Sequence, residues 1–148
     1  MNSQEPQSAN LSPSHQVMQF LWPGVMAAQA IHVAAKLKLA DLVAAGPKTI
    51  EELAETTQTH RLSLGRFLRA LTSLGIFAED AAGRFWQTEL SDTLCDDHSE
   101  SIRHWATMLG APFIWEPFGR LDETIRTGQP AFERVYRGEF LHQAQILS

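Results

Sequence analysis

The strongest constraint on this chain is a long stretch without a charged side chain, from Gln16 to Ala35. Its length is close to the ~20 apolar residues that a membrane-spanning helix needs. It nevertheless holds three glutamines and a histidine, and Pro23-Gly24 interrupts it. Polar amides and a helix-breaking pair argue against a span. We therefore expect a soluble, heavily buried helical region and no membrane partner.

The pattern in this region predicts two helices. The first is short, begins with Ser14 as its cap and ends near Pro23-Gly24; the second runs from about Val25 to Ala45. Apolar side chains surround the second helix almost completely down to Lys36. A helix that is apolar nearly all round must be covered on several sides. A chain of 148 residues has little surface for that purpose, so we expect a second copy to supply part of the cover in an intertwined homodimer.

The next segment predicts a winged helix-turn-helix. Thr49 and Glu52 have the spacing of a capping box and open a short helix over 50–56, and Thr59 can cap a longer helix over 60–74. Apolar runs at 76–78 and 84–86 indicate a β-hairpin. Further helices are expected near 102–109 and 114–127. The predicted fold class is mainly α: a winged helix-turn-helix with a small β-hairpin plus extra N- and C-terminal helices.

The chain length indicates one domain. Residues 1–13 are polar and rich in proline and serine, so we expect a disordered arm. Residues 14–136 form the predicted winged-helix domain, and residues 137–148 form a tail. The opening segment lacks the basic and apolar regions of a signal peptide, and the single cysteine, Cys95, excludes an internal disulfide. We therefore expect a cytoplasmic location.

A winged helix suggests DNA binding, which stays open as an alternative function: a winged-helix DNA-binding regulator. The charges do not favour it. Between positions 47 and 90 there are five basic and six acidic residues, and the net charge of the chain is −5. A domain that neutralises several phosphates usually shows a basic excess. We therefore expect no nucleic-acid partner.

The sequence contains no recognisable catalytic or cofactor motif. Its two nearest glycines, Gly75 and Gly83, are too far apart for a phosphate-binding glycine loop. The histidines lack metal-ligand spacing, and the adjacent residues from Cys95 to His98 cannot all converge on one ion. No nucleophile, base and orienting group can be assembled. We therefore assign no catalytic, cofactor-binding or metal residue.

Aromatic and methionine side chains gather near the C-terminal helices, with few charges among them: Met108, Phe113, Trp115 and Phe132. Core packing is the first interpretation of such a group. The alternative is a wall of a pocket for a flat organic ligand. A stand-alone small-molecule-binding module is therefore a third possible function.

The order of motifs resembles a known family. The segments 35–42 and 46–54, the helix at 66–77, the strand and turn at 85–90, and the segments 115–121 and 127–132 resemble the N-terminal dimerisation domain of S-adenosylmethionine-dependent O-methyltransferases. The resemblance covers about residues 14–136 and includes the plant phenolic, bacterial polyketide and acetylserotonin types. It implies a winged-helix module that dimerises and helps to enclose the substrate.

The resemblance also implies positions for functional residues. The dimer interface would contain Met18, Phe20, Leu21, Trp22, Met26 and Ile31. An aromatic acceptor would contact Met108, Trp115 and Phe132. The family's S-adenosylmethionine would bind in the full-length parent, since only twenty residues (148 − 128) follow Gly128, fewer than one βαβ unit requires. We therefore expect this chain alone to bind no cofactor and to be inactive, and we expect Ile31→Asp to break the dimer.

Overall fold

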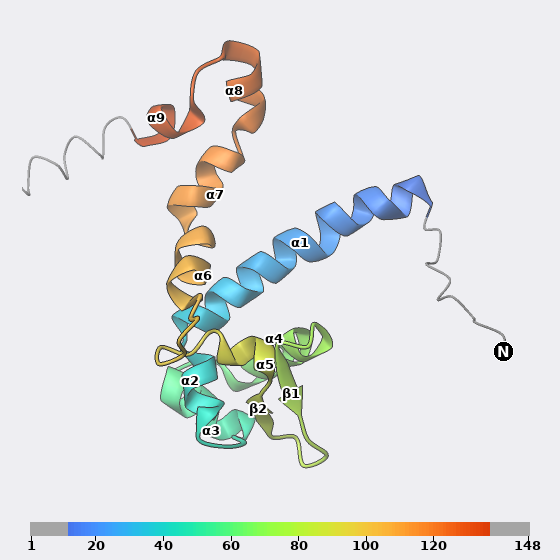
Figure 1. Cartoon of the computed structure of the whole chain (residues 1–148), viewed down its shortest axis with the longest axis vertical. Helices are drawn as coiled ribbons and strands as arrows, with labels where there is room; N and C mark the ends of the chain where they lie inside the picture. Colours follow the sequence, from blue (N-terminus) through green and yellow to red (C-terminus); the bar gives the residue numbers. More distant parts are fainter. Residues whose placement is uncertain (1–11, 137–148) are drawn as a thin grey trace, which may run out of the picture.

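The computed structural model describes residues 12–136. A body of short helices and one hairpin carries two arms that diverge from it (Figure 1). One arm is the N-terminal helix, α1 (Pro13–Lys36), and the other contains α6 (Arg103–Leu109) and α7 (Pro112–Phe118). The predicted arm at 1–13 and the tail at 137–148 lie almost wholly outside the described residues.

The body contains the predicted helix-turn-helix. It consists of α2 (Leu39–Ala44), α3 (Ile50–Thr57) and α4 (Arg61–Ser73). The predicted capping box opens α3: the Thr49 hydroxyl accepts from the Glu52 amide at 3.3 Å, and the Thr49 amide donates to the Glu52 carboxylate at 2.8 Å. The cap predicted for α4 is wrong by one residue. His60 is its N-cap, because the Thr59 hydroxyl is engaged with that of Thr57 at 2.9 Å.

The predicted hairpin is confirmed, one residue later than expected. Strands β1 (Phe77–Glu79) and β2 (Phe85–Gln87) pair antiparallel. Phe77 and Phe85 are fully buried, and burial of one face fixes the register, since a slip of either strand by one residue would turn its phenylalanine to solvent. Phe85 also exchanges backbone hydrogen bonds with Lys48, which attaches the hairpin to the turn before α3.

The core lies between α2, α3, α4 and the hairpin. Helix α4 contributes one apolar stripe at helical spacing, as the periodicity predicts. Of that stripe, Phe67 is half-buried and Leu74, the C-cap, is exposed. The largest fully buried apolar side chains of the core are Leu39, Val43, Leu53, Leu68, Leu71, Phe77 and Phe85.

The predicted boundaries in the N-terminal region are wrong. Helix α1 continues through Pro23-Gly24, and it ends at Lys36 instead of reaching Ala45. A proline removes one backbone donor, and the carbonyl left free can be hydrated where a helix is exposed, so the helix is not forced to stop. The chain turns instead at Lys38, whose φ of 54° is left-handed. That turn directs α2 into the core.

The C-terminal arm is more divided than predicted. After α5 (Glu89–Asp92) and α6, the helix expected over 114–127 is two helices, α7 and α8 (Leu121–Thr127). Pro117 lies inside α7 and cannot donate to the carbonyl four residues earlier, and α7 ends one residue later. A final helix, α9 (Ala131–Tyr136), was not predicted. It follows Gly128, whose φ of 68° reverses the chain.

The two arms cross where α1 meets α6. Gln29 donates to the carbonyl oxygen of Gly110 at 3.2 Å, and Nδ1 of the buried His32 lies 3.3 Å from the carbonyl oxygen of Ala106. A Cβ atom at Gly110 would overlap the Cβ of His32. The glycine is therefore required by the closeness of the two backbones rather than by its own conformation.

We predict that Gly110→Ala destabilises the chain. The added methyl group forces α6 away from α1, and such overpacking costs about 1–3 kcal/mol. Differential scanning calorimetry should show a melting temperature lower by about 3–10 °C. Gly24→Ala is the matched control: its Cβ meets no atom within 4 Å in an exposed helix, so it should be neutral or stabilising. Equal melting temperatures for Gly110→Ala and the unmodified chain would contradict the close crossing.

Candidate functional site

The front half of α1, residues 13–26, carries large apolar side chains on the surface. Phe20 is 82% exposed and Trp22 is 67% exposed. An exposed apolar side chain on its own is ordinary, but a contiguous group of them marks an interaction surface. The group comprises Val17, Met18, Phe20, Leu21, Trp22, Val25 and Met26.

These side chains do not form one stripe. At 100° per residue they spread over more than half of the helix circumference. A single flat partner would cover only one side of such a helix. Figure 1 shows the front half of α1 extending away from the body, with no element of the same protomer beside it. The cover therefore has to come from outside the protomer and from more than one direction.

Among the described residues, α1 is also the one helix with the length and hydropathy of a membrane span. Its last third belongs to the folded body: His32, Ala34 and Ala35 are buried, and Ala34 is part of the core. Insertion of the whole helix into a bilayer would require these residues to leave the body, including the contact between His32 and α6.

Five of the six side chains predicted for the interface belong to this exposed group. The sixth, Ile31, is half-buried and packs against the core of its own protomer. It has correspondingly less surface to offer to a partner. Val17 and Val25 were not predicted but are equally part of the group; both belong to the same uncharged stretch.

The C-terminal arm presents a second exposed apolar surface. It belongs to the helices α6 to α9, and four of its aromatic residues are 43–66% exposed. Charged side chains on this arm pair with one another, as in the contact of Arg134 with Glu123 at 3.1 Å. The exposed apolar residues are Trp105, Met108, Leu109, Phe113, Phe118, Leu121, Ile125 and Phe132.

The three residues predicted to contact an acceptor lie on this arm. Met108 is on α6, Trp115 on α7 and Phe132 on α9. Trp115 donates its indole N–H to the carbonyl oxygen of Leu109 at 2.7 Å, which fixes α7 against α6. The ring of Phe132 lies 5.1 Å from that of Tyr136. Two hollows in the described part of the chain lie elsewhere, beside α2 and α3 and between α1 and α4. The assignment of these three residues stays a prediction.

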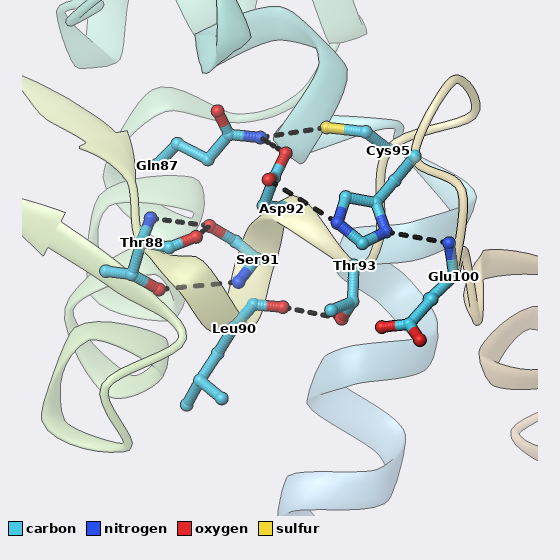
Figure 2. Close-up of polar contacts among 9 residues, drawn as sticks. Gln87, Thr88, Leu90, Ser91, Asp92, Thr93, Cys95 and Glu100 are labelled. Carbon is cyan, nitrogen blue, oxygen red and sulfur yellow. Dashed lines mark hydrogen bonds and ion pairs between the residues drawn. The ribbon is translucent and has the colours of Figure 1, made fainter.

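Two of the adjacent residues from Cys95 to His98, Cys95 and Asp96, are engaged with other partners; Figure 2 shows the contact of Cys95. Gln87 donates to Asp92 at 3.0 Å and to the sulfur of Cys95 at 2.9 Å. Asp96 accepts from Lys38 at 2.6 Å and also pairs with Arg103. Within residues 12–136, no three histidine, cysteine or acidic side chains are placed to share an ion.

The electrostatics around Cys95 favour a structural role. Burial raises the pKa of the Cys95 thiol, and the nearby carboxylate of Asp41 raises it further. A thiol of raised pKa is a poor nucleophile. The hydrogen bond from Lys38 lowers the pKa of Asp96, and Arg103 acts in the same direction. Asp96 thereby links the end of α1 to the start of α6.

Three arginines of the helix-turn-helix and hairpin are paired with acids. Arg61 on α4 contacts Glu51 at 2.6 Å. Arg69 makes a forked contact with Glu79 on β1, at 3.1–3.2 Å. Arg84 contacts Asp80 at the tip of the hairpin at 2.8 Å. Two of the three arginines on α4, Arg61 and Arg69, are therefore neutralised by neighbouring carboxylates.

Comparison with known proteins agrees with this description. The family model described as the O-methyltransferase dimerisation domain matches residues 21–97. A 2,7-dihydroxy-5-methyl-1-naphthoate 7-O-methyltransferase of Streptomyces carzinostaticus is 40% identical over 112 residues, covering 75% of this chain and 34% of that protein.

Solved structures of methyltransferases also match most of this chain. The N,N-8-amino-8-demethyl-D-riboflavin dimethyltransferase of Streptomyces davawensis superposes with a TM-score of 0.81 at 31% identity, over 86% of this chain and 38% of that one. An O-methyltransferase from neocarzinostatin biosynthesis, solved with S-adenosylmethionine and 2-hydroxy-5-methyl naphthoic acid, gives a TM-score of 0.66 at 37% identity, over 79% of this chain and 36% of that one.

The chain spans about a third of the length of the curated relatives it matches. The matched region begins within the exposed half of α1 and includes the whole helix-turn-helix and hairpin. The order of helices, the hairpin and the family match together show that this chain belongs to the O-methyltransferase dimerisation domain family.

Proposed function

We propose that the chain forms a homodimer through the front half of α1. The observation that carries this proposal is the exposure of seven large apolar side chains on residues 17–26. Burial of one such side chain contributes about 1.5–3 kcal/mol. In a two-fold symmetric dimer each protomer buries the same surface, so each side chain in the contact is buried twice. This gain has to offset the ~4–15 kcal/mol that association costs.

We propose further that the C-terminal arm forms part of the wall around an aromatic acceptor in an O-methyltransferase. The relatives support the chemical class: one is named for a dihydroxy naphthoate, and another was solved with a hydroxy naphthoic acid. Met108, Trp115 and Phe132 are the residues of this chain assigned to that contact. Their role is to position the acceptor and exclude water, and positioning supplies much of the rate of a two-substrate transfer.

In this proposal the methyl donor, S-adenosylmethionine, binds outside the described residues. The glycines of this chain are too widely spaced for a phosphate-type loop, and no catalytic base is assigned to it. The cytoplasm is the proposed location, where a buried cysteine stays reduced. Neither nucleic acid nor membrane is a proposed partner.

We predict that Met26→Glu weakens the dimer. A carboxylate placed at the proposed contact loses its hydration on association, which is costly without a partner charge. Sedimentation velocity should show a shift from dimer to monomer at concentrations where the unmodified chain is dimeric. Met26 is exposed and is not part of the core, so the melting temperature of the monomer should change little.

Leu62→Glu is the matched control, because Leu62 is an exposed leucine on α4; this variant should remain a dimer. Ile31→Asp should also break the dimer, but it should lower thermal stability too, because Ile31 packs on the core. If Met26→Glu were as dimeric as Leu62→Glu, α1 would not be the interface.

We predict that the chain alone transfers no methyl group. With radiolabelled S-adenosylmethionine and a hydroxy naphthoate, it should give no product above a protein-free blank. The physical reason is the absence of an assigned donor site and base in its own residues. Product formation that scales with the concentration of the chain would contradict this prediction.

We also predict no salt-dependent binding to duplex DNA. Phosphate contacts by free cations would give an affinity that falls steeply with added salt, but Arg61, Arg69 and Arg84 are held by carboxylates. A gel-shift titration at 50 and 200 mM salt should show no complex at either concentration. A complex that forms only at the lower salt would restore the regulator hypothesis.

A further inference from the structure

A shallow apolar groove lies beside α1 on the surface of the body. It has a volume of about 240 Å³. Val33 and Leu37 from the end of α1 form one wall, and Leu64 and Phe67 of α4 form the other. Val33 is exposed and Phe67 is half-buried. The groove therefore presents an apolar surface that its own protomer leaves open.

The polar groups on the edge of the groove are already paired. Nδ1 of His60 lies 3.0 Å from the hydroxyl oxygen of Ser63, and the hydroxyl of Thr59 bonds with that of Thr57. A ligand recognised by hydrogen bonds would have to compete with these contacts. An apolar side chain would leave them intact, so an apolar occupant fits the groove better.

The groove continues the exposed surface of α1. Met18, Trp22, Met26, Gln29, Val33 and Leu37 are spaced by three or four residues and so lie along one side of the helix. The first three belong to the exposed front half, and the last two line the groove. One stripe therefore runs from the free end of α1 into the groove.

A chain cannot fill this groove with its own stripe. Trp22 lies eleven residues (33 − 22) before Val33 on one continuous helix, which is about 17 Å. A second copy can do so if the two α1 helices pack antiparallel about a two-fold axis. If the two-fold axis places Met26 opposite Gln29 of the second copy, the antiparallel register follows. Trp22 then lies opposite Val33 of the second copy, and Met18 lies opposite its Leu37.

We propose that the groove between α1 and α4 receives Trp22 of a second copy of this chain, in an antiparallel pairing of the two α1 helices. This inference rests on the proposed dimerisation and specifies its geometry. Each protomer then supplies one tryptophan and one groove, so the contact is made twice. A large aromatic side chain in an apolar pocket is the usual anchor of a tight interface.

The first test fills the groove. Ser63→Arg places a long charged side chain on its edge without removing a core residue, whereas Leu62→Arg makes the adjacent change on the same helix outside the groove. Sedimentation equilibrium should give a dimer dissociation constant about tenfold higher or more for Ser63→Arg, and an unchanged one for Leu62→Arg. Circular dichroism melts confirm that both variants fold.

The second test is cross-linking. In Met18→Cys/Ser63→Cys, a short bismaleimide should join two chains, seen as a dimer band on a denaturing gel. Each single variant should give no such band, and Cys95 is buried and should not react. Within one protomer the two positions are too far apart, because Met18 precedes Val33 by fifteen residues (33 − 18) of helix, about 22 Å.

The outcomes of these tests distinguish the groove pairing from dimerisation itself. A dimer that is insensitive to Ser63→Arg and gives no cross-linked band overturns the groove pairing and leaves dimerisation intact. An unmodified chain that sediments as a monomer at all concentrations overturns dimerisation itself. Weakening by Ser63→Arg together with the intermolecular band establishes the antiparallel pairing.

Discussion

The exposed apolar front half of α1 is the constraint on which the rest of the structure depends. A helix of 24 residues is about 36 Å long, and only its last third reaches the body of the protomer. The remainder carries Phe20 and Trp22 into solvent on different sides. Such a helix is stable in water only when something else covers it. In the proposed homodimer a second copy of the same helix supplies that cover.

The crossing of α1 and α6 connects the two arms. His32 packs against Gly110, and Gln29 bonds to the carbonyl of the same glycine. The position of α1 therefore depends on the position of α6, and α6 leads into the arm that carries Trp115. The proposed dimerisation through α1 is thus coupled, through this crossing, to the placement of the C-terminal arm. A domain that dimerises and also encloses a substrate would make use of such a coupling.

The body of helices and hairpin serves as a scaffold in this chain. Arg61 and Arg69 on α4 pair with carboxylates, and the hairpin tip holds Arg84 against Asp80. The core of the body holds the base of both arms. Its helix α4 also supplies the wall of the groove opposite Val33. The helix that would read DNA in a winged-helix regulator is here proposed to receive a protein side chain.

Local signals predicted the body well. The Thr49–Glu52 capping box, the apolar stripe on α4 and the hairpin are all present, because each depends on neighbours close in sequence. The boundaries in both arms were predicted less well. Pro23 did not end α1, and Pro117 did divide the C-terminal helix, since the effect of a proline depends on what surrounds the freed carbonyl.

The sequence by itself determined that the front of this chain is too apolar to stand alone, because the uncharged stretch from Gln16 to Ala35 can be counted without a structure. Only the tertiary structure decided which of those side chains are free. Ile31 packs against the core and His32 contacts α6, whereas Phe20 and Trp22 are exposed. The groove beside Val33 also required the structure, since its walls come from α1 and α4 and no local pattern records that they meet.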